Sequence, residues 1–153
     1  ELLVALRRRK TKEVIAELRT CIQPRVLDDL MLLWKGTSSV WDKAFVGEIH
    51  LNPTFAGSRD VGGADADWII NGVLYDCKIS KRQRPFSRRE VLQVLGYVLL
   101  DYDAIYGIHS IGWYYARQQD RFTHPLTNIM QRLNVLKSLQ TLRTEFRSFV
   151  TTT

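Results

Sequence analysis

The spacing of apolar positions along this 153-residue chain predicts helices toward both ends and strands between them. Apolar residues recur at helical spacing over residues 2–18, 26–34 and 129–150, so we expect a basic amphipathic helix, a short second helix and one long C-terminal helix. Residues 41–51 fit a helix or a strand equally well. Residues 52–63 are rich in helix and strand breakers, which predicts a loop.

The clearest local pattern predicts a β-hairpin. Two short runs of apolar β-formers, residues 68–70 and 73–75, flank the dipeptide Asn71-Gly72. Asn-Gly is the typical pair of a two-residue type I′ turn, because both of its residues adopt positive φ readily. We therefore expect an antiparallel hairpin that pairs Ile70 with Val73 and continues outward from there.

A helix and a buried strand are predicted after the hairpin. Ser87 and Glu90 have the spacing of a capping box, and the helix that they begin runs to about Leu100. Residues 108–116 form an apolar run that is typical of a buried strand. This order of elements predicts an α/β fold, with a small mixed sheet flanked by helices, in a single domain over residues 1–153.

Extending the hairpin register brings charged residues together. Asp67 falls opposite Asp76, and Asp65 falls opposite Lys78. Because side chains alternate between the two faces of a strand, all four project from one face. Carboxylates at that spacing repel one another unless a cation lies between them, and Mg²⁺ prefers carboxylate and water oxygens. The triplet Asp76-Cys77-Lys78 is also the single Asp/Glu-x-Lys in the sequence.

The segment GGADADWIINGVLYDCKIS, residues 62–80, resembles the core of the PD-(D/E)XK nuclease superfamily. That core has an Asp at the start of one strand and Asp/Glu-x-Lys on its antiparallel neighbour. Gln93 and Tyr97 match the Gln-x-x-x-Tyr signature of the branch that resembles the RecB nuclease domain. The similarity covers roughly residues 45–116 and departs from the pattern at Ala66, where the family name has proline.

The resemblance implies a restriction-endonuclease-like fold and a role for each matching residue. Asp67 and Asp76 would bind Mg²⁺ or Mn²⁺, and Lys78 would be the catalytic lysine, with Gln93 and Tyr97 beside it. Many members take a further acid from a segment before the hairpin. For that position we favour Glu48 over Glu17 and Asp60, while Asp65 would join the metal shell or replace Asp67.

The charge of the chain suits a polyanionic partner. The net charge is +6, and residues 78–89 carry six basic residues and no acid. Phosphate contacts supply most non-specific nucleic-acid affinity, and they make it depend steeply on salt. The residues expected to hold the backbone of DNA are Lys81, Arg82, Arg84, Arg88 and Arg89.

Other sequence features bound the function. No apolar stretch approaches the roughly 20 residues of a membrane span, and we expect no secretory signal. Cys21 and Cys77 have no metal-ligand spacing and are expected to be buried thiols, which favours a cytoplasmic protein. His50, His109, His124, Asp101 and Asp103 are expected to be structural or solvated.

These features predict a Mg²⁺-dependent nuclease that hydrolyses DNA with little sequence specificity. A non-catalytic nucleic-acid-binding or assembly module with the same fold, and a nuclease acting on RNA, remain alternatives. Endonuclease and exonuclease action fit equally, as do roles in defence, restriction and repair. Other domains, other subunits or further copies of the chain are compatible with the same pattern.

Overall fold

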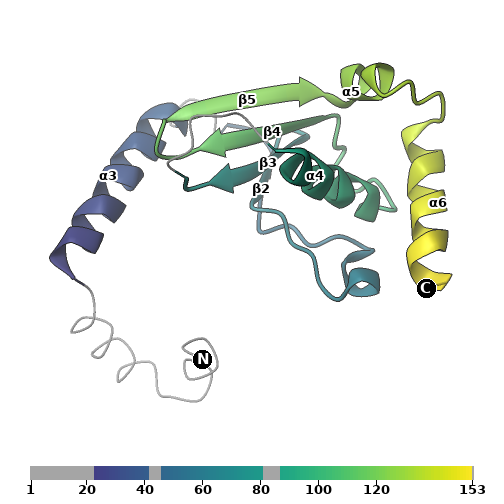
Figure 1. The fold of residues 1–153 in the computed structure, drawn as a ribbon, viewed down its shortest axis with the longest axis horizontal. Helices are drawn as coiled ribbons and strands as arrows, with labels where there is room; N and C mark the ends of the chain where they lie inside the picture. Colours follow the sequence, from purple (N-terminus) through teal and green to yellow (C-terminus); the bar gives the residue numbers. More distant parts are fainter. Residues whose placement is uncertain (1–22, 42–45, 81–86, 153) are drawn as a thin grey trace, which may run out of the picture. The chain divides into compact units, whose positions relative to one another are not determined.

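The computed structural model describes residues 23–41, 46–80 and 87–152. Contacts divide the chain into two compact units, residues 1–36 and 37–153. The described part of the first unit is the beginning of helix α3 (Pro24–Trp41), drawn in blue in Figure 1. The helix predicted over residues 2–18 lies outside the described residues.

Helix α3 is longer than the sequence predicts. The predicted range of residues 26–34 is too short, because the helix begins at Pro24 and continues past Gly36 to Trp41. A glycine inside a helix costs about 1 kcal/mol relative to alanine. The side chain of Trp41 is only 1% exposed, and burial of an aromatic side chain stabilises the last turn by more than that cost.

The second unit is built on a five-stranded mixed sheet. Its strands follow the chain order: β1 (Ile49–Leu51), β2 (Trp68–Ile70), β3 (Val73–Lys78), β4 (Ser110–Tyr115) and β5 (Asp120–Pro125). Strands β3 and β4 are parallel and the other neighbours are antiparallel. The predicted α/β class with a small mixed sheet is confirmed. Strand β5 was not predicted, because its residues are mostly exposed and polar and it ends in proline.

The hairpin forms in the predicted register. Ile70 pairs with Val73 and Trp68 pairs with Tyr75. Asn71 and Gly72 have φ values of 48° and 73°, both positive as a type I′ turn requires. An added Cβ on Gly72 would lie 2.7 Å from the carbonyl oxygen of Gly107, so the turn also depends on the missing side chain.

Strand β3, helix α4 (Arg88–Leu100) and strand β4 form a βαβ unit. The predicted capping box is confirmed, with hydrogen bonds between Ser87 and Glu90 in both directions. Helix α4 covers one face of the sheet, where Val94 and Val98 join the same buried cluster as Leu74 and Ile111 (Figure 1). We call this side the α4 face.

Aromatic side chains fill the opposite face. The ring of Trp41 lies edge-on to Trp68, Tyr75 and Tyr114, with centroid distances of 5.0–5.4 Å. The guanidinium of Arg121 lies 5.0 Å from the centre of the Trp41 ring. Edge-to-face pairs add about 0.5–1.5 kcal/mol of stability each beyond the contribution of their buried area. This cluster therefore stabilises the packing on the face of the sheet opposite α4.

The predicted C-terminal helix is divided in two. Helix α5 (Leu126–Arg132) has Leu133 as its C-cap. Helix α6 (Leu139–Thr152) begins after a turn in which Asn134 has a φ of 52°. Apolar spacing continues through this turn, so the sequence pattern alone does not reveal it. The division allows α6 to pack against α4.

A buried ion pair joins α6 to the end of α4. Arg143 donates to the Asp101 carboxylate at 3.3 Å and to the Val98 carbonyl at 3.1 Å. Asp101 is only 1% exposed, so the expectation of a solvated loop acid was wrong. Asp103 is exposed as expected.

The loop after β1 contains a short 3-10 helix, η1 (Ser58–Val61). Within the described ranges, no helix has both the length and the apolar character needed to cross a membrane.

Candidate active site

Asp76 and Lys78 form an ion pair on the α4 face of β3. The Lys78 Nζ lies 2.8 Å from Asp76 Oδ2 and 3.1 Å from Oδ1. Alternation along the strand places these two residues on the same side, while Cys77 points to the other face. The Asp76 side chain is 7% exposed and that of Lys78 is 24% exposed, so the carboxylate is buried and the ammonium reaches solvent.

Burial dominates the electrostatics of Asp76. It raises the pKa of the carboxyl group, and the neighbouring Lys78 opposes that rise. The charges of Asp67 and Glu90 raise the pKa further. The Oδ2 atom is buried, and its contact with the Lys78 ammonium at 2.8 Å offsets only part of the burial. The carboxylate is therefore incompletely compensated.

Helix α4 contributes Gln93 and Tyr97 to the same place. Lys78 Nζ donates to Gln93 Oε1 at 3.4 Å, and Gln93 Nε2 donates to the Tyr97 hydroxyl at 2.9 Å. An ammonium can only donate, so it orients the amide oxygen toward Lys78 and the amide nitrogen toward Tyr97. The two residues lie four apart and share one helix face, as predicted.

Asp67 approaches the site in a different way from the one predicted. Backbone pairing between β2 and β3 ends at Trp68–Tyr75, so the expected ladder pair with Asp76 is absent. Instead, the Asp67 Oδ2 accepts a hydrogen bond from the backbone N–H of Cys77 at 2.6 Å. The carboxylate replaces the backbone acceptor at the end of the ladder, and it stays near enough for its charge to act on Asp76.

Asp65 leaves the ladder altogether. It forms an antiparallel bridge with Thr54 rather than pairing with Lys78, so the predicted pairing was wrong. The reason is that residues before Trp68 turn toward the loop that follows β1. There the Ala66 N–H donates to the Pro53 carbonyl, and the Asp67 carbonyl accepts from Asn52.

Glu48 lies at the turn end of the hairpin. Its backbone carbonyl accepts from Asn71 N–H, and its carboxylate contacts His50 Nε2 at 3.0 Å. Asp67 is at the opposite end of β2, so Glu48 does not join Asp67 and Asp76. Asp60 accepts from the Tyr102 hydroxyl, and Glu17 is outside the described residues. In the part of the chain that is described, no three or more His, Cys, Asp or Glu side chains are grouped to hold a metal ion.

Two residues near Asp76 were not identified as site residues from the sequence. Glu90, assigned there only to the helix cap, is close enough to raise the pKa values of Asp76 and Tyr115. Tyr115 is 5% exposed, and its hydroxyl has no hydrogen-bond partner among the described residues. The spacing of three residues between Glu90 and Gln93 on one helix could have indicated that Glu90 lies near the site. Tyr115 gave none, because it pairs with Lys78 only through the parallel register.

The predicted basic residues are only partly described. Arg88 and Arg89 are exposed in the first turn of α4, whereas Lys81, Arg82 and Arg84 lie outside the described residues. A positive charge in the first turn opposes the helix dipole, so helix stability does not explain these two arginines.

Asp67 and Asp76 are the carboxylates best placed to hold a divalent cation. Mg²⁺ commonly uses one or two protein carboxylates and completes its coordination with water. The Asp76 carboxylate is buried and paired with Lys78, and its pKa is still raised, so a further positive charge beside it would stabilise the ionised form.

Cys77 is a free, half-buried thiol beside these acids. Burial and the charges of Asp67 and Asp76 raise its pKa to about 11. At neutral pH the thiol is protonated, which makes it a poor nucleophile.

Comparisons with protein-family models, curated proteins and solved structures give no match for this chain.

Proposed function

We propose that this chain is a metal-dependent nuclease with a restriction-endonuclease-like core, and that it hydrolyses DNA. The observation that carries the proposal is the connected set Asp76–Lys78–Gln93–Tyr97. An ion pair of 2.8 Å and hydrogen bonds of 3.4 and 2.9 Å link these side chains across β3 and α4. The resemblance in sequence implies a role in the site for these same four residues.

The partly exposed ammonium of Lys78 has a clear chemical use. Asp76 and Gln93 each accept one of its three N–H donors, and the third can orient a water molecule or stabilise charge that develops on a phosphate oxygen. Asp67 and Asp76 would hold Mg²⁺ or Mn²⁺, which supplies Lewis-acid activation of phosphate and water when bound. The Gln93–Tyr97 pair limits the rotation of the lysine.

The distribution of charge supports a nucleic-acid substrate. The chain has a net charge of +6, and the exposed Arg88 and Arg89 lie in the first turn of α4. Contacts of this kind recognise phosphate rather than base sequence. We therefore expect cleavage with little sequence preference, and binding that weakens steeply with salt.

The direct test is cleavage of circular plasmid and linear duplex DNA in Mg²⁺ and in Mn²⁺. We expect the wild type to cut, and Lys78→Ala and Asp76→Asn to be slower by about 10²–10⁴-fold, the usual contribution of a positioned proton-transfer or charged group. Nicking of the circle would indicate an endonuclease, and degradation of linear DNA alone would indicate an exonuclease.

Matched controls separate site effects from general charge effects. Lys137→Ala removes a lysine that pairs with Glu145 on the surface, and Asp103→Asn removes an exposed acid. Both should retain wild-type cleavage within about twofold, as surface substitutions usually do. Equal cleavage by all variants would refute the site, and DNA binding without cleavage by any protein would favour a non-catalytic binding module. Cleavage of RNA but not of DNA would show that the substrate of the nuclease is RNA.

A further inference from the structure

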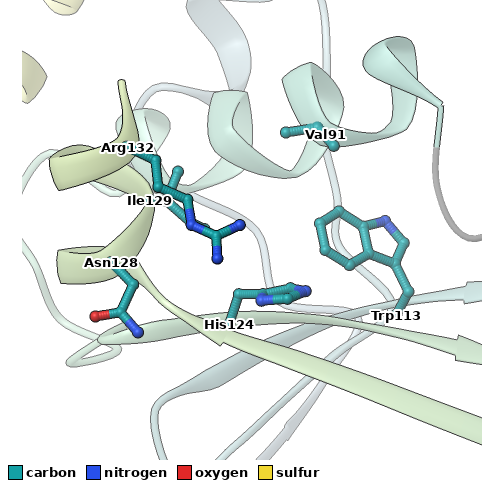
Figure 2. A pocket seen from close by; sticks show the side chains of 6 residues that line it. All are labelled: Val91, Trp113, His124, Asn128, Ile129 and Arg132. Atoms are coloured by element: carbon teal, nitrogen blue, oxygen red, sulfur yellow. The ribbon is translucent and has the colours of Figure 1, made fainter. Parts of the chain in front are cut away.

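A pocket of about 160 Å³ opens on the α4 face beside the candidate active site. Figure 2 shows its residues: Val91 comes from α4, Trp113 from β4, His124 from β5, and Asn128, Ile129 and Arg132 from α5. A water molecule occupies about 30 Å³ of liquid, so the pocket holds about five waters. That space suits a phosphate group with a little solvent, and it is small for a drug-sized molecule.

The polar groups of the pocket favour an anion. Arg132, His124 and Asn128 can all donate hydrogen bonds, and none of the six lining residues is acidic. The Arg132 guanidinium is directed into the pocket (Figure 2). Its side chain forms no ion pair or hydrogen bond with the described residues, so its donors are available. Apolar contacts from Val91, Ile129 and Trp113 lower the local dielectric and strengthen attraction to a charge.

The pocket is one strand away from the candidate active site. Trp113 pairs directly with Asp76 in the parallel register of β3 and β4. Paired residues of neighbouring strands project from the same face, about 4.8 Å apart in the direction of the hydrogen bonds. Val91 also follows Glu90 on α4 and stands two residues before Gln93. A strand of nucleic acid that is cut at Asp76 therefore passes near this pocket.

We infer that the pocket binds a phosphate group of the nucleic-acid strand, and that Arg132 is its main ligand. This inference rests on the proposed function. Asn128, which lines the same pocket, supplies a second donor to the phosphate oxygens. The bound phosphate is either a terminal monoester or an internal diester of the strand, and both offer the same oxygens to the arginine. Fixing a second phosphate sets how the strand lies across Asp76 and Lys78.

The placement of Arg132 has a structural explanation that must be separated from binding. It lies in the last turn of α5, where a positive charge is favourable to the helix dipole. A helix-stabilising arginine would affect unfolding and leave ligand binding unchanged. A phosphate ligand would affect binding with little change in the unfolding midpoint.

The test measures binding of fluorescently labelled 12-nucleotide strands by anisotropy, without divalent metal, in the full chain carrying Lys78→Ala. Strands with a 5′-phosphate, with a 3′-phosphate and with hydroxyl ends are compared, and inorganic phosphate serves as competitor. We expect Arg132→Gln to raise Kd about tenfold, as loss of a charge-assisted hydrogen bond does, and Asn128→Ala to raise it by about threefold. A loss confined to one phosphorylated end identifies a terminal phosphate, whereas an equal loss on all strands identifies an internal one.

The matched control is Arg59→Gln, which removes the same charge from an exposed arginine of η1. It should change Kd by less than about twofold, as a distant surface charge does. Arg132→Gln binding indistinguishable from Arg59→Gln would overturn the inference, as would an absence of competition by inorganic phosphate. The KM of Arg132→Gln in the otherwise wild-type chain separates the two proposals. Cleavage with an unchanged KM rejects the pocket alone, and tight Arg132-dependent binding by a chain that never cuts rejects the nuclease alone.

Discussion

The carboxyl group of Asp76 is placed where a charged form is unfavourable. It is buried beneath α4, with one lysine as its close counter-charge and two other acids near enough to raise its pKa. A fold under selection for stability alone would place an apolar residue here, because a buried ion pair recovers little of its desolvation cost. The arrangement is therefore consistent with a residue retained for chemistry.

This placement makes stability depend on pH. Burial raises the pKa of Asp76 in the folded state above its unfolded value, so the folded chain keeps this proton to a higher pH. The associated stability is present below the unfolded pKa, about 3.9, and is lost as pH rises through the higher folded pKa. The substituted amide does not ionise, so the Asp76→Asn variant lacks this pH-dependent destabilisation. The free energy of unfolding of the variant, relative to that of the wild type, should therefore increase as pH rises from about 3.5 to 7.

Urea denaturation over that pH range measures the difference. The raised pKa of Asp101 is present in both proteins and cancels. Added Mg²⁺ should stabilise the wild type and leave Asp76→Asn nearly unchanged, because only the carboxylate form holds the cation well. A constant difference between the two proteins at every pH would contradict this account.

At the scale of elements, local chemistry determined which predictions succeeded. The Asn71-Gly72 turn and the Ser87–Glu90 capping box depend on residues within four positions of one another, and both formed as predicted. The extra turns of α3 and the division of the C-terminal helix depend on partners distant in sequence. Trp41 is held by the aromatic face of the sheet, and α6 is held by α4.

The predictions for the candidate site also succeeded where they depended on local sequence and failed where they depended on distant partners. Asp76 and Lys78 share a face because strands alternate, and that was predictable. The expected positions of Asp65 and Glu48 were not realised, because the chain turns away before Trp68 and because Glu48 pairs with the hairpin turn. Tyr115 required the parallel register of β3 and β4, which no local pattern reveals.

The hairpin turn provides a test at this scale. Gly72→Ala should destabilise the protein by about 1–3 kcal/mol, because Ala resists positive φ and its Cβ would meet the Gly107 carbonyl. Gly96→Ala is the matched control. Gly96 lies inside α4 with open space around its Cα, so the substitution should stabilise by about 0.5–1 kcal/mol. Chemical denaturation measures both, and equal effects in the two variants would contradict the role of the turn.

At the scale of the second unit, the buried Arg143–Asp101 pair holds α6 on α4. Arg143 is 4% exposed, and burial lowers the pKa of its guanidinium while Asp101 opposes that change. The pair joins residues 42 positions apart in the sequence. The pair lies at the C-terminal end of α4, beyond Gln93. It therefore supports the helix that positions the site and does not contact Asp76 or Lys78.

Removing one partner of this pair should be costly. Arg143→Ala leaves the buried Asp101 carboxylate and the Val98 carbonyl without their donor, and we expect a loss of about 3–5 kcal/mol. The double variant Asp101→Asn/Arg143→Met removes both charges and should lose less than the single variant. Urea denaturation compares them, and a double variant less stable than Arg143→Ala would contradict this explanation.

The parallel pairing of β3 with β4 also has a consequence for the folding pathway. The β2–β3 hairpin closes through a two-residue turn and can form early, so Asp76 and Lys78 are neighbours from the first moments of folding. Their burial must wait for β4, which reaches β3 only after the intervening helix has crossed over the sheet. The ion pair thus forms in water, and its carboxylate is dehydrated later. Desolvation of the Asp76 carboxylate is therefore expected to fall late on the route to the native state, where it slows closure of the βαβ unit.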